Sequence, residues 1–350
     1  SPFNGQIKDI LIIDGKISTI ADSITAKADE TIEQSGLCVS IGWMDIFADF
    51  GDPGYEYKES IETGAKAAAA GGFTDIMLIP NSSPVVDNKS QVEYIVQKAK
   101  QVPVNIYPIG SISKKAEGKE LSEMYDMRQS GAIAFTDGIH PVQNSGLLLK
   151  SLQYVKSFDG TVIQVPDDTS IGSNGLMNEG IISTQMGLPG KPTMAEELLV
   201  ARDIKLARYA DSKLHFTGVS SPKSLEYIKR AKEGGIKVTC SVTPYQIFFC
   251  DEDLQDYDSN LKLNPPVRSR AEMMMIRHAL LDGTIDCVAS HHLPQHWDNK
   301  TCEFEYAKPG MIGLETMFAV LTECGLPAED FVQMQTVNVR NIFSLPVPEI

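Results

Sequence analysis

Residues 43–54, WMDIFADFGDPG, combine a short apolar run with a polar loop. The apolar run has the length and composition of a buried β-strand. Asp45, Asp49 and Asp52 lie within or just after this strand, and Gly51 and Gly54 indicate a turn behind it. Carboxylates at the end of a strand are typical of the mouth of an α/β enzyme, so the segment bears on both the fold and the site.

The same alternation repeats from residue 41 onward. Short apolar runs predict strands over residues 42–46, 75–79, 104–109, 131–135, 161–165, 214–217, 237–242 and 285–290. Helical patterns predict helices over residues 60–70, with Ser60 as the N-cap, and over 91–100, 118–128, 146–156, 195–210, 222–233, 270–281 and 313–322. Eight strands each followed by a helix have the count and size of an α/β protein of the (β/α)8 TIM barrel type.

A doubly wound open sheet also alternates strands and helices, but two observations favour the barrel. The first strand is followed by neither a Gly-rich dinucleotide fingerprint nor a Walker A sequence. The eight units are preceded by residues 7–22, IKDILIIDGKISTIAD, which alternate apolar and polar positions around Asp14 and Gly15. This alternation predicts a β-hairpin within residues 1–40.

The composition restricts the partners. Thirty-one basic and 46 acidic residues give a formal net charge of −15, which repels nucleic acid and anionic lipid. No apolar run reaches the roughly 20 residues needed to cross a bilayer, and no signal sequence is recognisable at the start. Six cysteines without a CxxC pair are typical of reduced thiols. We therefore expect a cytoplasmic protein that binds neither nucleic acid nor membrane.

Polar residues follow several predicted strands. They are Asp45, Asp49 and Asp52 at the first strand, Asn81 after the second, Asp137 after the fourth, Asp167 and Asp168 after the fifth, and His291 and His292 after the eighth; Gly218 follows the sixth. In a barrel the carboxyl ends of all strands meet at one face, where the chemistry takes place. Carboxylates are plentiful at this face and histidine is scarce.

Several long segments, in order, resemble the dihydroorotase family of the amidohydrolase superfamily. The first is residues 42–88, from GWMDIFADFGDPGYEYKES to IPNSSPVVDN. The others are LMNEG (176–180), AEELLVARDIKLA (195–207), SVTP (241–244), DEDL (251–254), KLNPPVRS (262–269), DGTIDCVAS (282–290) and GMIGLET (310–316). The resemblance covers nearly the whole chain.

The resemblance implies a zinc site, but most of its positions are altered here. A His-x-His pair after strand 1 falls on Phe47 and Asp49, and the histidines after strands 5 and 6 fall on Val165 and Gly218. The aspartate after strand 8, ligand and general acid/base in the family, falls on His291, which leaves only Asp137 as the carboxylate after strand 4. Phenyl, isopropyl and hydrogen offer zinc no lone pair, so we expect neither a bound metal nor a catalytic residue.

The substrate positions implied by the resemblance are altered as well. An arginine that would hold the substrate carboxylate falls on Gly51, and the second histidine of the strand 8 motif falls on Gln295. Asn81 and Asn264 remain as neutral hydrogen-bonding positions. Together with Gln295 they form the expected residual substrate pocket.

The resemblance thus implies a catalytically silent dihydroorotase-like protein of pyrimidine biosynthesis. Its barrel is expected over residues 41–340, with a small β-sandwich built from residues 1–40, toward which residues 341–350 return. Family members without a metal site serve as structural or regulatory partners of aspartate transcarbamoylase, which makes that enzyme the expected partner. A homodimer is a second expectation.

Other interpretations remain open. Asp45, Asp49, Asp137, Asp167 and Asp168 are either turn and helix caps or an oxygen-rich Mg²⁺ or Ca²⁺ site in an active cyclic amidohydrolase. His291 is a further candidate for a metal role, although adjacent histidines such as His291 and His292 point in opposite directions on a strand. His215 is expected to be a buried, hydrogen-bonded histidine. In a third interpretation, the residual pocket binds a pyrimidine precursor without converting it.

Overall fold

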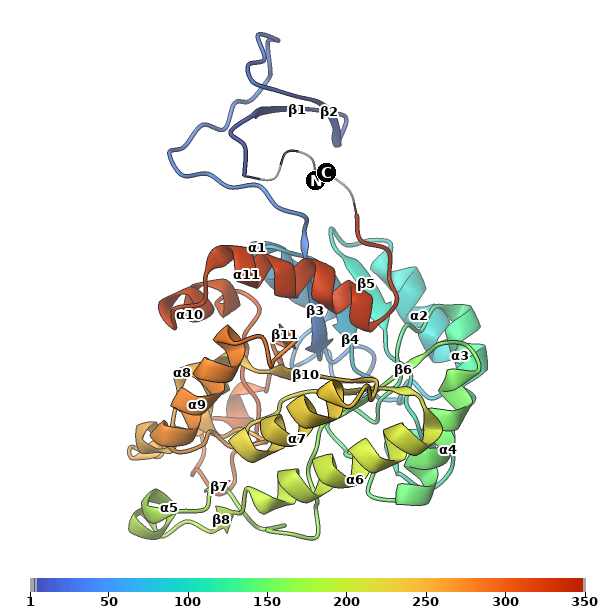
Figure 1. Ribbon diagram of the computed structural model, residues 1–350, viewed down its shortest axis with the longest axis vertical. Helices are drawn as coiled ribbons and strands as arrows, with labels where there is room; N and C mark the ends of the chain where they lie inside the picture. The colour runs from blue at the N-terminus through green and yellow to red at the C-terminus, as the bar shows by residue number, and fades with distance from the viewer. Residues whose placement is uncertain (1–2, 4, 349–350) are drawn as a thin grey trace. The chain divides into compact units, whose positions relative to one another are not determined.

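Parallel strands form the centre of residues 42–345. The computed structural model describes residue 3 and residues 5–348. One ladder contains β3 (Trp43–Ala48), β4 (Phe73–Leu78) and β5 (Asn105–Pro108), and the second contains β6 (Thr161–Gln164), β9 (Lys213–Phe216), β10 (Val238–Val242) and β11 (Cys287–Val288). All neighbouring strands of both ladders pair in parallel, with the helices around them (Figure 1).

Two short connections close these ladders into a barrel. Phe135 bridges Gly110 on one side and Val162 on the other, so it replaces a full fourth strand between β5 and β6. On the opposite side, Ala48 bridges His292, which joins the first strand to the segment after β11. The predicted (β/α)8 barrel is confirmed, although the predicted strand over residues 131–135 is reduced to one bridging residue.

The last strand is shorter than the predicted 285–290 because side chains replace part of its backbone ladder. The buried carboxylate of Asp45 accepts hydrogen bonds from Ser290 N (2.6 Å) and Ser290 Oγ (2.8 Å). The carboxylate of Asp286 accepts one from Cys240 N at 2.7 Å. Asp45 therefore connects the first and last strands of the barrel, in keeping with a structural role for this residue.

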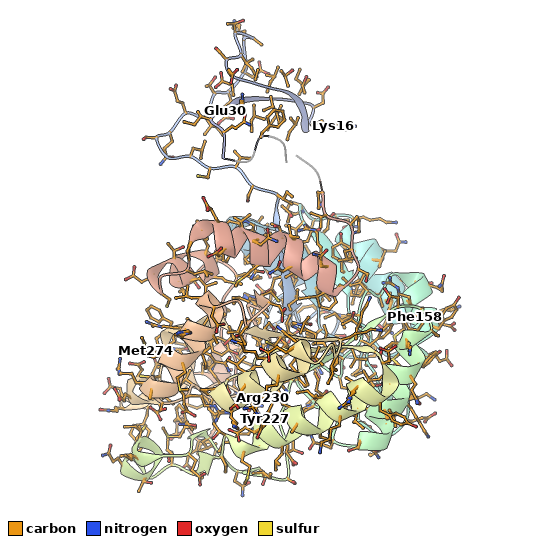
Figure 2. All side chains as sticks on the ribbon, viewed as in Figure 1. Lys16, Glu30, Phe158, Tyr227, Arg230 and Met274 are labelled. Atoms are coloured by element: carbon orange, nitrogen blue, oxygen red, sulfur yellow. The ribbon has the colours of Figure 1, made fainter. Side chains whose placement is uncertain are left out.

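The outer helices match most of the predicted ones. They are α1 (Ile61–Ala70), α2 (Lys89–Ala99), α3 (Met124–Ser130), α4 (Ser145–Lys156), α6 (Met194–Ala210), α7 (Pro222–Glu233), α9 (Arg270–Leu281) and α10 (Met317–Glu323). Ser60 caps α1 as predicted, because its side chain accepts a hydrogen bond from Thr63 N. After α10 the chain continues through α11 (Ala328–Gln333), the π-helix η5 (Met334–Asn338) and α12 (Val339–Ile342). The outward faces of these helices are largely exposed, as at Arg230 of α7 and Met274 of α9 (Figure 2).

The predicted helix over residues 118–128 is wrong in its first half, since α3 begins only at Met124. The preceding residues bond instead to the loop after β5. Ser122 N donates to Ile112 O at 2.9 Å, and Gly118 N donates to the hydroxyl of Ser113 at 2.7 Å. In the predicted helix Ser122 N would have donated to Gly118 O, so its bond to Ile112 O replaces the first intrahelical hydrogen bond.

An insertion after β6 adds a second, smaller core. It contains β7 (Met177–Asn178), α5 (Ile181–Met186) and β8 (Gly190–Lys191), with β7 and β8 paired in parallel. Its apolar residues pack with those of α8 (Pro244–Phe248), η2 (Asp251–Leu254) and η3 (Ser259–Leu261), with the loop after η3, and with residues after η4 (Trp297–Asn299). The buried members of this core are Met177, Leu188, Tyr245, Leu254, Leu261, Leu263, Val267 and Phe304.

The described residues up to Ile41, with those from Pro346 onward, form a separate compact unit. In it β1 (Asp9–Ile13) pairs antiparallel with β2 (Lys16–Ala21), which confirms the predicted hairpin. Asp14 and Gly15 form its turn with φ of +50° and +73°. The β-sandwich remains a prediction. None of the helices among the described residues is long and apolar enough to cross a membrane.

Candidate functional site at the barrel mouth

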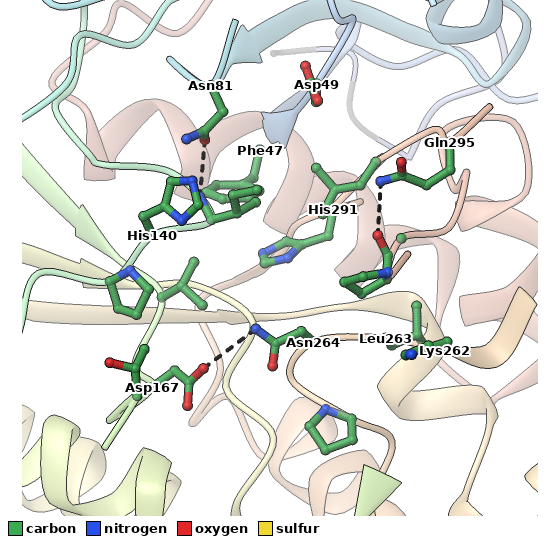
Figure 3. A pocket seen from close by; sticks show the side chains of 18 of the residues that line it. Phe47, Asp49, Asn81, His140, Asp167, Lys262, Leu263, Asn264, His291 and Gln295 are labelled. Atoms are coloured by element: carbon green, nitrogen blue, oxygen red, sulfur yellow. Dashed lines mark hydrogen bonds between the residues drawn. The ribbon is translucent and has the colours of Figure 1, made fainter. Parts of the chain in front are cut away.

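A cavity of about 680 Å³ lies at the carboxyl ends of the barrel strands. Loops after β3, β4, β6 and β11 contribute to its wall, and so do the insertion and the loop carrying Asn264 (Figure 3). The predicted site positions among its lining residues are Phe47, Asp49, Asn81, Val165, Asp167, Asn264, His291 and Gln295. A volume of this size is within the range of pockets that bind small molecules.

Two aromatic rings stack where the resemblance implies metal ligands. The rings of Phe47 and His291 have centroids 4.2 Å apart and planes inclined by 22°, and both residues are buried (Figure 3). Val165 adds a buried isopropyl group to the same cavity. These groups form an apolar floor, because the phenyl and isopropyl groups have no polar atoms.

Gly218 leaves room for the imidazole of His291. A Cβ atom at position 218 would lie 2.7 Å from Cε1 of His291, closer than nonbonded carbon atoms approach one another. Gly218 also has φ of +70°, a backbone conformation that side chains disfavour. The imidazole therefore occupies the space that a ligand side chain at position 218 would need.

His291 ends a row of hydrogen-bonded side chains. Ser241 Oγ donates to Thr217 Oγ1 at 2.9 Å, and Thr217 Oγ1 lies 2.8 Å from His291 Nε2. Nε2 of His291 is therefore already hydrogen-bonded to a side chain inside the barrel. Burial lowers the pKa of His291 to about 3, so the ring is uncharged near neutral pH.

The row continues to His215, which is fully buried as predicted. Its Nε2 lies 3.1 Å from Ser241 Oγ, and its Nδ1 lies 2.8 Å from Thr239 Oγ1. Burial lowers the pKa of His215 to about 3 as well. Because Ser241 donates to Thr217, His215 donates from Nε2 to Ser241 and accepts from Thr239.

His292 points away from its neighbour. Its Nε2 lies 2.5 Å from Glu59 Oε2, and its Nδ1 accepts a hydrogen bond from Gly313 N at 3.2 Å. His291 bonds to Thr217 instead, so the two adjacent rings have separate partners, as expected for consecutive residues.

The candidate carboxylates do not converge on one point. Asp45 bonds to Ser290, Asp137 accepts from Ser113 N (2.9 Å) and Ser113 Oγ (2.5 Å), and Asp168 accepts from Ser170 N at 3.0 Å. Asp49 accepts from Gly51 N at 2.8 Å. Burial raises the pKa of Asp49, and it raises the pKa of Asp137 to about 6. Asp49 and Asp168 therefore cap local turns, whereas Asp45 and Asp137 bond to segments far away in the sequence.

Metal-binding geometry is not found among residues 3 and 5–348. In this range, no group of three or more His, Cys, Asp and Glu side chains is placed to hold a metal ion. The zinc site implied by the resemblance would need Phe47, Val165 and Gly218 to supply lone pairs that they lack. Asp137, the position that keeps its residue type, faces Ser113 and is not among the cavity-lining residues. The residues present do not fit zinc.

The three predicted pocket amides all line the cavity, but their hydrogen bonds differ. Asn81 donates to Asp137 O and accepts from Ile139 N, each at 3.1 Å, so it supports the loop after Phe135. Gln295 donates to Pro309 O at 3.0 Å. Asn264 bonds to side chains within the cavity wall and is described with Lys191 below.

Sequence reasoning missed the lysines of the cavity, which are Lys58, Lys115, Lys191 and Lys262. Lys191 Nζ lies 2.5 Å from Asp167 Oδ2 and donates to Asn264 Oδ1 at 2.9 Å. Lys58 Nζ lies 5.0 Å from the centroid of the Tyr55 ring. Lys262 donates to the carbonyl oxygens of Phe304 (2.6 Å) and Glu305 (2.8 Å). The sequence GLPGKP (187–192) contains Lys191, but nothing in this segment indicates that the side chain returns to the mouth.

Comparison with known proteins agrees with this fold. Residues 36–224 match the family described as "Dihydro-orotase-like". The protein named dihydroorotase from Syntrophus aciditrophicus is 40% identical over 350 residues, covering 98% of this chain and 82% of that protein. The one from Geobacter metallireducens is 44% identical over 313 residues, covering 89% and 74%.

A solved structure supports the architecture at lower identity. The L-hydantoinase (dihydropyrimidinase) from Arthrobacter aurescens superimposes with a TM-score of 0.83 at 22% identity, over 96% of this chain and 78% of that one. This likeness concerns the fold. From the family match and the two sequence relatives, we conclude that the chain belongs to the dihydroorotase-like family.

Proposed function

We propose that this chain is a non-catalytic member of the dihydroorotase-like family that acts as a structural or regulatory partner of aspartate transcarbamoylase in pyrimidine biosynthesis. The observation that carries the proposal is the arrangement of Phe47, His291 and Gly218. A stacked phenyl and imidazole fill the place where the resemblance implies metal ligands, and no side chain fits at position 218.

Opening a ring amide at neutral pH requires an activated water, which this family generates with a metal. Phe47 and Val165 cannot bind a metal, and Nε2 of His291 is already hydrogen-bonded to Thr217 Oγ1 at 2.8 Å. His291 is also neutral near pH 7, because burial lowers its pKa to about 3.

The intact frame supports a role that needs a folded barrel. The closing bridges at Phe135 and His292, the cap at Ser60 and the contact between Asp45 and Ser290 are all in place. The changes relative to the family pattern lie at the mouth instead. Aspartate transcarbamoylase enters the proposal through the family resemblance.

The test of catalysis is turnover of dihydroorotate and of carbamoyl aspartate by the purified chain, with zinc added and with a chelator added. We expect no conversion above a protein-free control in either case. Metal analysis after dialysis is expected to find no stoichiometric zinc. The partnership is tested by co-purification from the native cell and by size-exclusion chromatography with the aspartate transcarbamoylase of the same organism, where a joint peak is expected.

An active cyclic amidohydrolase is the second candidate, and the names of the relatives favour it. This alternative predicts conversion of dihydroorotate, hydantoin or allantoin that a chelator abolishes and that added Mn²⁺ or Mg²⁺ restores. Such activity, from protein free of contaminating enzyme, would contradict the non-catalytic proposal.

A further inference from the structure

Lysine side chains hold the segment after η4, residues 300–308, against η3. Lys300 Nζ donates a hydrogen bond to Ser259 O at 2.9 Å. Lys262 follows η3, and its Nζ donates to two backbone carbonyl oxygens of the segment at 2.6 and 2.8 Å. The backbone N of Lys262 donates to the same Ser259 O at 3.1 Å. Lys262 and Lys300 therefore belong to one cluster, which is joined through Ser259.

The two ammonium groups of this cluster lack a paired carboxylate. In the part of the chain that the structure describes, their hydrogen-bond acceptors are backbone carbonyl oxygens, and neither lysine forms an ion pair. Lys262 is buried and Lys300 is half-buried. Two like charges in a partly desolvated place each disfavour the protonated form of the other.

Lys300 is accordingly a weaker base than an ordinary lysine. Burial lowers its pKa to about 8, and the charge of Lys262 acts in the same direction, against the raising effects of Asp258 and Cys302. An amine with this pKa is unprotonated in roughly one molecule in ten at pH 7, against roughly one in 3,000 at the ordinary value of 10.5. Only the unprotonated amine has a lone pair with which to attack carbon, so Lys300 is a nucleophile near neutral pH.

The surroundings of Lys300 attract anions. Lys308, at the end of the segment, adds a third positive charge, and its N donates to Asn299 O at 3.0 Å. The carboxylates that face the cluster are those of Asp258 and Glu305. The cluster thus has a surplus of positive charge on a chain of net charge −15, and such a surplus concentrates anionic reagents locally.

We propose that Lys300 is a site of covalent acylation by small acyl phosphates. Its unprotonated amine attacks the acyl carbon and forms a C–N bond, the bond from this carbon to the phosphate oxygen breaks, and a proton from the nitrogen leaves with the phosphate. The amide product is uncharged, which ends the repulsion with Lys262, and it keeps one N–H that can still donate to Ser259 O. The inference goes beyond the proposed function and holds whether or not the chain has turnover.

The test is incubation of the purified chain with acetyl phosphate at pH 7, followed by digestion with a protease that does not cut at lysine. Mass spectrometry then gives the initial rate of acetylation at each lysine. Lys308 is the internal control, because it is exposed and lies in the same segment.

We expect acetylation of Lys300 to be faster than that of Lys308 by about tenfold or more. Relative to a lysine of ordinary pKa, the larger unprotonated fraction gives a gain of roughly 300-fold, and the weaker nucleophilicity of a less basic amine reduces this gain by about one order of magnitude. The rate at Lys300 should rise up to about pH 8 and then level off. A rate at Lys300 no higher than that at Lys308, or one that still rises steeply between about pH 9 and about pH 10, would overturn the proposal.

Neighbouring charges provide a second test, with opposite signs. Lys262→Gln removes the repelling charge, so acetylation of Lys300 at pH 7 should become several-fold slower. Asp258→Asn removes an attracting charge, so the same reaction should become several-fold faster. Changes in the same direction, or no change in either variant, would overturn the proposal.

Matched controls accompany these variants. Lys237→Gln removes a lysine charge whose side chain is 51% exposed, and Asp256→Asn removes an exposed carboxylate near Asp258; neither should change the rate at Lys300. Urea denaturation shows which variants fold. If buried Lys262 does not tolerate glutamine, Asp258→Asn decides alone, since asparagine can keep the cap that Asp258 provides to Asn260 N.

Discussion

His291 and Gly218 form a matched pair at the barrel mouth: the imidazole of one fills the space that a side chain on the other would need. A Cβ atom on Gly218 would lie 2.7 Å from Cε1 of His291, and the ring stacks at 4.2 Å on Phe47. Restoring a ligand at position 218 alone is therefore blocked by the residue at position 291.

The first prediction is a coupling between positions 218 and 291. Gly218→Ala should lower the free energy of unfolding by about 2–4 kcal/mol, because the new Cβ overlaps the imidazole and φ is positive. In a His291→Ala background, the destabilisation caused by Gly218→Ala should be smaller by about 1 kcal/mol or more. Urea denaturation of the two single variants and the double variant measures the coupling. Additive effects would show that the ring does not occupy this space.

A second prediction concerns zinc. The double variant Phe47→His/Asp49→His restores the His-x-His pair, but we expect no stoichiometric zinc after dialysis. Val165 and Gly218 still provide no ligands, and His291 still fills the space beside Gly218. Metal analysis by mass spectrometry is the measurement, with the unaltered chain as the control. One tightly held zinc per chain in this variant would contradict the account of the mouth.

Asp45 should be important for stability. Asp45→Ala removes the acceptor for Ser290 N and Ser290 Oγ in a fully buried place, so unfolding should become easier by about 2–5 kcal/mol. Asp45→Asn keeps one acceptor oxygen and should lose less. Chemical denaturation of both variants gives the comparison. If the alanine variant were as stable as the unaltered chain, the contact between Asp45 and Ser290 would not stabilise the barrel.

The fourth prediction is a pH dependence caused by Asp137. Burial raises its pKa from 3.8 to about 6, so the folded protein binds this proton more tightly than the unfolded chain. The bound proton of Asp137 therefore adds to the free energy of unfolding. This contribution is fully present below about pH 3.8 and is lost as the pH rises through about 6.

Asp137→Asn should remove the loss of stability that Asp137 causes as the pH rises, because an amide does not titrate. Between about pH 4.5 and about pH 7, the variant should gain stability relative to the unaltered chain, on the order of 2 kcal/mol. Some pH dependence in the same direction should remain, since burial also raises the pKa of Asp203 to about 6. Urea denaturation at both pH values is the measurement, with the exposed Asp256→Asn as the control. An identical pH profile for Asp137→Asn would refute the assignment.

The barrel could be predicted because its strands are apolar runs separated by amphipathic helices. The predicted bounds of one strand and one helix were wrong where side chains bond to backbone groups of the segment. Ser290 N bonds to the side chain of Asp45 rather than to the backbone of a strand, which shortened the last strand, and Ser113 binds the amide of Gly118 where a helix was expected. These contacts join residues far apart in sequence or depend on a loop conformation, so apolar periodicity does not contain them.

The resemblance to the dihydroorotase family placed Phe47, Val165 and His291 together at the barrel mouth, and all three do line one cavity. The charge of the cavity was not predicted. Lys191 lies well beyond the end of β6, in an insertion with its own core, and reaches the mouth only because β7 and β8 pair. Asp137 follows the expected strand, but its carboxylate faces Ser113, an orientation that residue type alone does not give.

A row of hydrogen-bonded side chains runs from Thr239 through His215, Ser241 and Thr217 to His291, and in its present direction Ser241 donates its single hydrogen to Thr217. If Ser241 donated to His215 instead, the proton of neutral His215 would move from Nε2 to Nδ1. An acceptor that bonds to Nδ1 of His291 would favour the present direction, and a donor there would favour the opposite one. The protonated nitrogen of His215, a ring sealed inside the barrel, would then report by nitrogen chemical shift which kind of molecule is seated at the mouth.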